Sequence, residues 1–245
     1  MKILVCISHV PDTTAKISFT ENNSSLDETG IQFIIGPYDD YALARAVELK
    51  ESNGASVTVL NVGEANTEPT IRKALAIGAD DSIRVNAAPT DAFFVAKQIA
   101  HIATAEEYDM ILMGRESIDY NSGVVHGLVG GMLGIPSISP VMKLDVDGEK
   151  VNLTREIDGG KEYIEVGLPI VAGCQEPIAE WKIPNMRGIM TARTKPLKVV
   201  EAIDSPASPT ISYENLPPKG EVKLVDPEKA EELIDLLINE AKVLN

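Results

Sequence analysis

The residue types best suited to binding chemistry gather in one polar loop, GRESIDYNSGVV, at residues 114–125. This loop follows an apolar run and leads into a helix-like segment. Exposed backbone N–H groups and the dipole of a following helix favour an anion, so the loop is suited to a phosphate. Many sheet proteins carry a similar loop that binds nothing, so the bare pattern leaves both interpretations open.

Two common phosphate motifs are missing from the sequence. It contains no GxxxxGK[ST], and no GxGxxG opens its first helix. Ordinary nucleoside triphosphatases and the usual dinucleotide dehydrogenases are therefore excluded as leading interpretations.

Candidates for catalysis are few. The histidines, His9, His101 and His126, are scattered, and no group of Cys, His and carboxylate residues has metal-site spacing. The acid pairs at residues 39–40 and 80–81 are adjacent in sequence, and adjacent side chains point apart on a helix or strand. We therefore expect no metal site and no catalytic residue. His9 and His126 fall on loops where either ligand contact or packing is open, whereas His101 fits a surface or packing role.

Length, composition and charge limit the classes of protein to which the chain can belong. The chain has 245 residues, of which 44% are apolar and 24% charged, with a formal net charge of −15. This charge disfavours nucleic acid as a partner, because phosphate binding needs clustered Lys and Arg. No apolar run reaches the roughly 20 residues of a membrane helix and no signal peptide is evident, so we expect a cytoplasmic location without membrane insertion. Cys6 and Cys174 lie in apolar runs, which favours small buried hydrophobic roles.

Strand-like runs alternate with helix-like segments before residue 140. Period-2 or continuous apolar runs predict the strands, and apolar residues three or four apart predict the helices. Gly78 is expected to end one helix and Thr90 to cap the next. Strands are expected at 3–7, 56–62, 81–85 and 109–113, and helices at 37–50, 67–77, 91–103 and 123–133. The alternation predicts an α/β fold with a doubly wound, mainly parallel sheet.

The pattern changes after Pro136. Turn signals separate three strands of a meander at 141–167, and a further strand at 168–172 is expected to return to the main sheet. Five prolines between residues 196 and 218 predict an extended arm or a linker. The last segment is an amphipathic helix capped by Asp226, suited equally to a partner subunit or to its own domain.

The expected sheet places the polar loops together. Ligands of open parallel sheets bind at the carboxyl ends of the strands, near the point where strand order reverses. The loops at 8–14, 62–66 and 114–125 follow the first, second and fourth strands, and the third loop is the strongest candidate. From the residues alone, the sequence predicts a nucleotide-binding α/β protein that is not an enzyme by itself.

Seven segments form a specific series along the chain: MKILVCISHVPD at 1–12, GPYDDYAL at 36–43, LAIGAD at 75–80, GRESID at 114–119, TREIDGG at 154–160, LPIV at 168–171 and IPNMRGIM at 183–190. In this order, they resemble segments of electron-transfer flavoprotein beta subunits. The resemblance implies a Rossmann-like fold of the adenine nucleotide alpha hydrolase type. It also implies two parts, a nucleotide-binding domain at 1–195 and an arm with a C-terminal helix at 196–245 that packs on the alpha subunit.

The resemblance also implies cofactors. The alpha subunit would supply most of the FAD site, while the beta subunit would clamp the FAD and bury an AMP of structural role. Carried over residue by residue, the AMP pocket would comprise Cys6, Gly36, Pro37, Tyr38, Asp39, Val62, Gly114, Arg115, Glu116, Ser117, Ile118, Asp119, Tyr120, Asn121, Ser122, Gly123, Val124 and Val125.

A partner-recognition loop maps by resemblance to residues 174–196. Met186 takes the place of an apolar anchor that inserts into an acyl-CoA dehydrogenase, although a local core role is equally open. Trp181 is the single tryptophan and fits a second contact or simple packing, and Ile183 and Ile189 are further contact candidates. The implied function is an electron carrier that accepts electrons from acyl-CoA and related dehydrogenases and passes them to a quinone-linked oxidoreductase.

One segment departs from the family pattern. Many relatives have Asn-Gln-Thr-Gly-Gln where this chain has GVVHG at 123–127, so a hydroxyl and an amide for the phosphate are missing. Electron-bifurcating members place a second FAD in this site and oxidise NADH, and DYNSGV at 119–124 partly echoes their motif. Although this departure counts against AMP, AMP stays the first candidate ligand, a second FAD is the next and an empty pocket is the third. A stand-alone adenine-nucleotide-binding protein that forms homo-oligomers is the alternative from another class.

Overall fold

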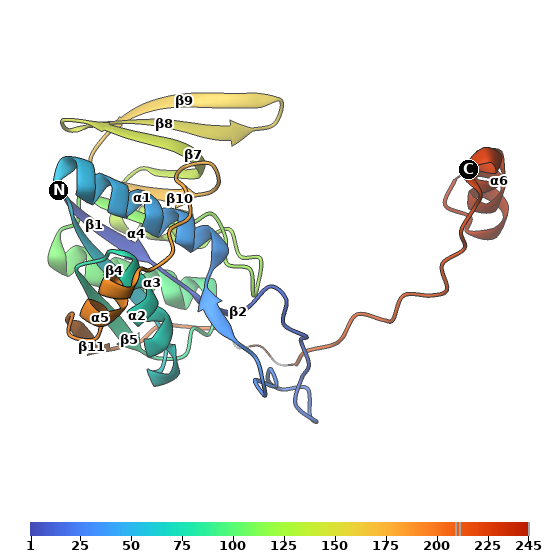
Figure 1. Cartoon of the computed structure of the whole chain (residues 1–245), viewed down its shortest axis with the longest axis horizontal. Coiled ribbons are helices and arrows are strands. Elements are labelled where there is room, and N and C mark those ends of the chain that lie inside the picture. The colour runs from blue at the N-terminus through green and yellow to red at the C-terminus, as the bar shows by residue number, and fades with distance from the viewer. Residues whose placement is uncertain (209, 211, 245) are drawn as a thin grey trace.

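A mixed sheet of nine strands forms the body of the chain in the computed structural model, which describes residues 1–208, 210 and 212–244 (Figure 1). The strands are β1 Lys2–Cys6, β4 Ser56–Val62, β5 Asp81–Asn86, β6 Met110–Gly114, β7 Ser137–Asp147, β8 Lys150–Ile157, β9 Gly160–Gly167, β10 Ile170–Cys174 and β11 Leu197–Glu201. Their order is β11-β5-β4-β1-β6-β10-β7-β8-β9, and pairing is parallel from β11 to β7 and antiparallel from β7 to β9.

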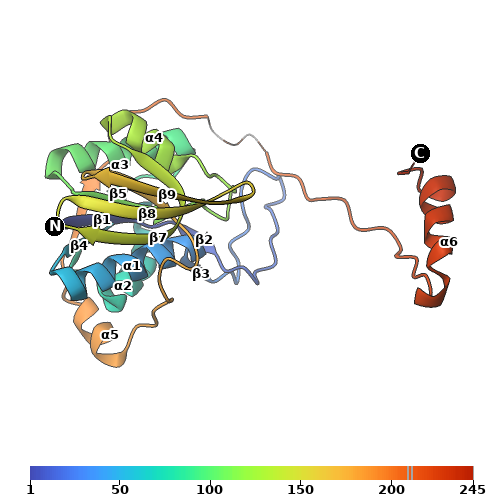
Figure 2. The ribbon, with the colours of Figure 1, turned by 90° about the horizontal axis from the view of Figure 1, so that it is seen from above.

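Helices cover both faces of the parallel part of the sheet (Figure 2). One face carries α1 Pro37–Asn53, α2 Glu68–Ile77 and α5 Met186–Ala192, and the other carries α3 Ala92–Glu106 and α4 Val125–Leu133. The side chains of β1 alternate between two cores, with Ile3 and Val5 in one and Leu4 and Cys6 in the other. A strand buried on both faces needs a continuous apolar run, which is why KILVC forms β1. The predicted fold class is confirmed.

Helix ends follow local chemistry closely. Pro37 takes the first turn of α1, and Gly54 ends the helix in the left-handed conformation at φ 68°. The predicted cap of α3 was wrong by one residue. Asp91, not Thr90, is the N-cap, because its carboxylate accepts a 2.7 Å hydrogen bond from the Phe94 N–H.

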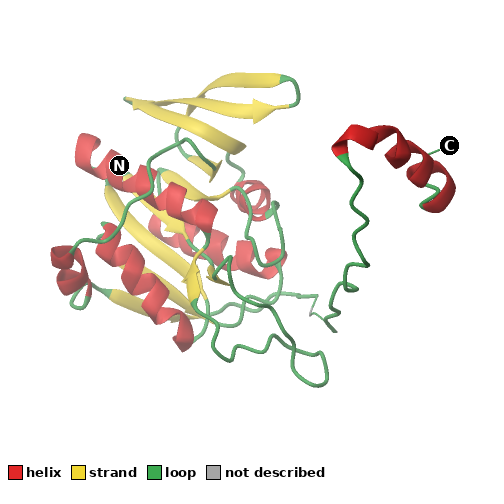
Figure 3. Cartoon of the chain, turned by 45° about the vertical axis from the view of Figure 1, so that its right-hand side comes forward, coloured by secondary structure: helices red, strands yellow, loops and turns green. Residues whose placement is uncertain are grey.

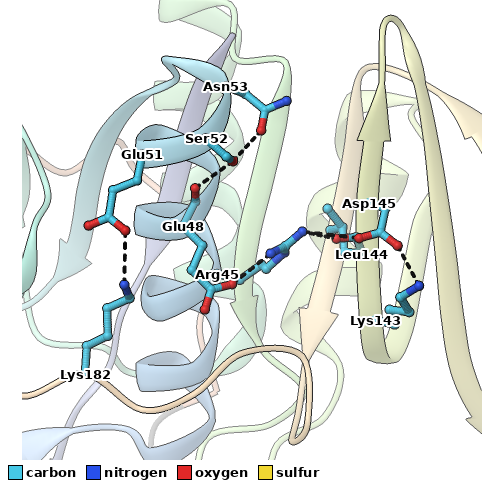
Figure 4. Close-up of polar contacts among 9 residues, drawn as sticks. All are labelled: Arg45, Glu48, Glu51, Ser52, Asn53, Lys143, Leu144, Asp145 and Lys182. Carbon is cyan, nitrogen blue, oxygen red and sulfur yellow. Dashed lines mark hydrogen bonds and ion pairs between the residues drawn. The ribbon is translucent and has the colours of Figure 1, made fainter.

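The meander continues the main sheet instead of forming a separate layer. Strand β7 pairs with β10 near its start and with β8 over the rest of its length. Arg45 of α1 fixes this extension, since its guanidinium donates to the Leu144 carbonyl of β7 and lies 3.5 Å from an Asp145 carboxylate oxygen (Figure 4). The meander is therefore held against the helix that also begins beside β1.

Four elements were absent from the sequence-based prediction. Strands β2 His9–Pro11 and β3 Phe33–Ile35 form a small antiparallel pair, and α5 is a two-turn helix after the irregular segment that follows β10. The fourth is β11, which pairs in parallel with β5 although we expected the extended arm to begin at residue 196. Extended chain instead follows Glu201, where the Gln98 side chain of α3 exchanges two 2.9 Å hydrogen bonds with the Ile203 backbone.

The C-terminal helical segment stands away from the sheet (Figures 1 and 3). Asp226 caps it as predicted, accepting a hydrogen bond from the Glu228 N–H at 3.0 Å. A 3₁₀ turn at Pro227–Lys229 leads into α6 Ala230–Asp235, and a π-helical turn at Leu236–Glu240 follows. Ile234 is 54% exposed and Leu233 45%, so the apolar stripe does not pack on the chain's own domain. None of the described helices has the length and apolar character needed to span a membrane.

Gly188 is expected to allow the close packing of α5 against α2. A Cβ at this position would lie 2.2 Å from the Ala76 carbonyl oxygen of α2. We predict that Gly188→Ala lowers the free energy of unfolding in urea by about 1–3 kcal/mol, the usual range for overpacking. Amide hydrogen exchange of α5 should also accelerate.

Gly131→Ala is the matched control for this change. Gly131 is exposed in α4, and a Cβ there meets nothing within 4 Å. Removing a helical glycine at an open position should leave stability equal or slightly higher. An unchanged urea midpoint in Gly188→Ala would contradict the proposed close approach.

Candidate functional site

A cavity of about 650 Å³ opens at the carboxyl edge of the sheet, where β1, β4 and β6 end. Strand β1 lies between β4 and β6, so successive connections leave this edge in opposite directions. Such a reversal of strand order is where open α/β sheets bind ligands. Eleven of the predicted pocket residues line the cavity: Cys6, Asp39, Val62, Gly114, Arg115, Glu116, Ser117, Asp119, Tyr120, Ser122 and Val125.

The other predicted pocket residues do not line the cavity. They are Gly36, Pro37, Tyr38, Ile118, Asn121, Gly123 and Val124. Two of them, Tyr38 and Asn121, help to position residues that do line it. The Arg115 guanidinium lies 4.7 Å from the centre of the Tyr38 ring and donates to the Gln175 side-chain oxygen at 3.0 Å. Asn121 has a φ of 48°, a left-handed conformation that turns the loop before Ser122.

The Asp39 carboxylate holds the floor of the cavity together. Its Oδ2 accepts hydrogen bonds from the Ser8 N–H at 2.8 Å and from the Ser8 hydroxyl at 2.5 Å, and its Oδ1 accepts from the Gly114 N–H at 2.7 Å. These bonds join the first turn of α1 to the residues that end β1 and β6. Asp39 lines the cavity, and its two oxygens accept hydrogen bonds from Ser8 and Gly114, so it stabilises the cavity wall. Its predicted role in ligand binding stays a prediction.

Burial raises the pKa of Asp39 to about 6, and the bonds from Ser8 and Gly114 lower it against that effect. The neighbouring Asp40 raises it further. A carboxylate with only 6% exposure carries a desolvation cost that the three donors offset in part. The ionised form at neutral pH therefore depends on these bonds remaining intact.

The polar loop ends at a helix terminus that faces the cavity. Helix α4 begins at Val125, and its N-cap residue, Val124, supplies no side-chain hydrogen bond to the first turn. The first N–H groups of a helix have no intrahelical acceptor, so they are available to an anion. Val125 and His126 line the cavity at this point. The phosphate site that the sequence predicts at this junction stays a prediction.

Acidic side chains dominate the charge of the cavity wall. Arg115 is the only lysine or arginine among the described lining residues. The acidic lining residues are Glu28, Asp39, Glu64, Asp91, Glu116 and Asp119. A bound phosphate would therefore depend on backbone N–H groups more than on cationic side chains, and a ligand with several phosphate charges would be repelled.

Both loop histidines lie at the cavity. The His9 ring stacks on Phe33 with 4.4 Å between ring centres, and its Nδ1 lies 2.8 Å from the Thr70 hydroxyl. The His126 Nδ1 lies 3.4 Å from the Ser137 hydroxyl. Burial lowers the pKa of each imidazole, so both are neutral at pH 7. Each therefore offers a neutral polar edge to the cavity.

Several parts of the wall were missed from the sequence, including Glu28 and Phe33, the turn after β5 and the arm. The turn after β5 contributes the lining residues Ala88, Pro89 and Thr90, and the arm contributes Ser208 and Thr210. The turn could have been found, because the carboxyl end of every parallel strand lies at the same edge. No sequence signal places the arm beside the cavity.

A second surface lies apart from the cavity, on the segment predicted to contact a partner. We call Trp181, Ile183, Met186, Ile189 and Met190 the exposed apolar surface. Met186 is 75% exposed and Ile183 72%, so a core role for Met186 is excluded. The Trp181 ring is 55% exposed, and its N–H donates to an Asp40 carboxylate oxygen at 3.1 Å. Such a cluster of exposed large apolar side chains is typical of a protein contact site.

Both cysteines are buried, as their apolar surroundings in the sequence predicted. Cys6 and Cys174 are buried, free thiols, and burial raises the pKa of Cys174 to about 12 and that of Cys6 still further. Both therefore stay neutral at pH 7. Over the described residues, no three His, Cys, Asp or Glu side chains gather closely enough to hold a metal ion.

Comparison with known proteins decides the family. The model of the family described as the Electron transfer flavoprotein domain matches residues 24–205. The Electron transfer flavoprotein subunit beta of Bacillus subtilis strain 168 is 34% identical over the full length of both chains. The chain belongs to the electron transfer flavoprotein beta-subunit family. This result confirms the resemblance found in the seven sequence segments.

Other members of the electron transfer flavoprotein beta-subunit family are also similar along most of their length. The human beta subunit is 30% identical over 83% of this chain and 82% of its own. A protein of Anaerotignum propionicum named Acryloyl-CoA reductase electron transfer subunit gamma is 30% identical over 97% of this chain and 98% of its own. All three are named as electron-transfer subunits, which agrees with an electron carrier rather than a stand-alone enzyme.

The raised pKa of Asp39 predicts a specific pH dependence of stability. The group titrates at about 6 in the folded chain and at 3.8 when unfolded, so between these values the folded state binds the proton more tightly. Its contribution to stability is greatest below pH 3.8 and falls by about 3 kcal/mol as the pH rises to 7. The stability of wild type relative to Asp39→Asn should therefore decrease from pH 4 to pH 7, measured by urea unfolding.

Asp27→Asn is the control for this titration. Asp27 is half-buried, and its hydrogen bonds from Thr29 lower its pKa, so its contribution to stability is lost only as the pH falls below 3.8. It should leave the pH dependence between 4 and 7 unchanged. A constant difference between wild type and Asp39→Asn across that range would show that Asp39 is not the titrating group.

Proposed function

We propose that this chain works as the beta subunit of a heterodimer whose alpha subunit carries the redox-active FAD. In this arrangement the chain helps to clamp the FAD, holds an adenine nucleotide of structural role in its own cavity, and presents a docking surface to dehydrogenases. Electrons would pass from the dehydrogenase to the FAD and then to a quinone-linked oxidoreductase. The observation that carries the proposal is the cavity at the ends of β1, β4 and β6, bordered by the uncapped start of α4.

AMP is the adenine nucleotide that the cavity favours. The cavity volume of about 650 Å³ lies within the usual range of small-molecule sites. The excess of carboxylates over the single Arg115 favours a ligand with one phosphate over one with a pyrophosphate. A second FAD, as in a bifurcating subunit that oxidises NADH, is the alternative ligand, and an empty pocket comes third.

The dehydrogenase partner would meet the exposed apolar surface. Among residues 181–200 there are five basic side chains and no acidic one, although the whole chain has a net charge of −15. The surface thus favours a partner with an apolar pocket and an acidic rim. Acyl-CoA and related dehydrogenases are our candidates, supported by a relative that is named as an electron-transfer subunit of acryloyl-CoA reductase. The uncovered apolar stripe of α6 favours packing on the alpha subunit.

Co-expression with the alpha subunit tests the assembly and the ligands together. We expect a yellow heterodimer from which mass spectrometry detects one FAD and one AMP per pair. Two flavins per heterodimer would favour the bifurcating alternative. A colourless chain that forms homo-oligomers and binds ATP would contradict the whole proposal and favour a stand-alone nucleotide-binding protein.

Ala88→Trp tests where the nucleotide sits. Ala88 is exposed at the cavity wall, so an indole there can occupy the cavity at little cost to the fold. We expect the heterodimer to form and keep its FAD while losing the released AMP. Ala105→Trp, on an exposed position of α3 outside the cavity, should retain both. Normal AMP content in Ala88→Trp would place the nucleotide elsewhere.

A further inference from the structure

A single hydrogen bond links the exposed apolar surface to the start of α1. Trp181 lies in the irregular segment between β10 and α5, where no ladder or helical bonds fix the backbone. Its indole N–H donates to the Asp40 Oδ2 at 3.1 Å. The ring itself is 55% exposed, so this bond, more than burial, determines how the indole is held.

Asp40 has a strong requirement for that donor. The residue is only 7% exposed, and its Oδ1 is buried without a hydrogen-bond partner among the described residues. Burial raises the pKa of Asp40, while the charge of Lys73 and the bond from Trp181 lower it. If the Trp181 N–H left, the buried Asp40 carboxylate would lose a hydrogen bond that compensates the cost of its burial. The position of Trp181 that keeps this bond is therefore strongly favoured.

The first turn of α1, which carries Asp40, is held in place by the hydrogen bonds of Asp39. The adjacent Asp39 ties the first turn of α1 to Ser8 and Gly114, so Asp40 cannot move to follow Trp181. Further along the same helix, Glu51 lies 3.3 Å from the Lys182 ammonium, directly after Trp181 (Figure 4). The segment is thus attached to both ends of α1 before it enters α5.

We infer that Asp40 is a positioning residue, which orients Trp181 and thereby preforms the exposed apolar surface for its partner. The inference rests on the proposed function, in which this surface docks a dehydrogenase. A surface that is ordered before binding does not lose that freedom on association, so docking is tighter. Asp40 itself contacts neither the partner nor a cofactor.

Trp181 fluorescence tests the positioning in the full-length chain alone, because it is the only tryptophan. We expect Asp40→Ala to raise acrylamide quenching and lower the anisotropy of the indole emission. Asp40→Asn keeps a carbonyl acceptor and should stay near wild type. Asp80→Ala, which removes the partner of Lys50, is the control and should leave the emission unchanged. Unchanged quenching in a folded Asp40→Ala would overturn the inference.

Electron transfer in the heterodimer tests the consequence for docking. With a reduced acyl-CoA dehydrogenase as the varied substrate, Asp40→Ala should raise the KM about three- to ten-fold with kcat unchanged, as expected for losing one or two ordered side chains. Trp181→Phe keeps the ring without the donor and should raise the KM similarly. The double variant should be no worse than either single one, because both remove the same bond.

Different results would contradict the proposed function and the positioning role of Asp40. If the wild-type heterodimer accepts no electrons from any acyl-CoA dehydrogenase, the proposed function is wrong, and the fluorescence result still decides the role of Asp40. If wild type transfers electrons and Asp40→Ala has the same KM, the positioning role in docking is wrong. Rescue of both readouts by Asp40→Asn supports it.

Discussion

The three hydrogen bonds to the Asp39 carboxylate are the constraint on which the site depends. They bring the end of β1, the start of α1 and the end of β6 to one point. Glycine is required on both sides, because a Cβ would lie 2.5 Å from an Asp39 oxygen at Gly36 and 2.7 Å from one at Gly114. A buried charge tolerates such crowding only while every donor is in place. The cavity floor is therefore held together by these three bonds.

Asp40, the residue after Asp39, connects the same turn of α1 to the exposed apolar surface. Asp39 faces the cavity, whereas Asp40 accepts the Trp181 N–H at the exposed apolar surface. Adjacent residues at the start of a helix point in different directions, so one turn of α1 serves both places. The cavity presents backbone N–H groups and a polar loop, while the exposed surface presents Met186 and Ile183. The cavity and the exposed apolar surface thus share one support, the first turn of α1.

The arm divides into two parts with different environments. Its first part follows α3, bonds to Gln98 and contributes Ser208 and Thr210 to the cavity wall. Its last part carries α6 away from the sheet with Ile234 and Leu233 uncovered. An amphipathic helix needs an apolar counterpart to bury its stripe. In the proposed heterodimer, the alpha subunit would supply that counterpart.

The sequence by itself determined the elements whose signals are local. Continuous apolar runs predicted β1 and β4, capping chemistry predicted the start of the C-terminal helix, and the parallel-sheet rule placed the cavity beside residues 114–125. The tertiary structure alone decided the rest. The donors to Asp39 are 31 and 75 residues away, β11 pairs with a strand more than 100 residues earlier, and Trp181 reaches Asp40 across 141 residues. Such pairings depend on three-dimensional proximity, which neither periodicity nor spacing encodes.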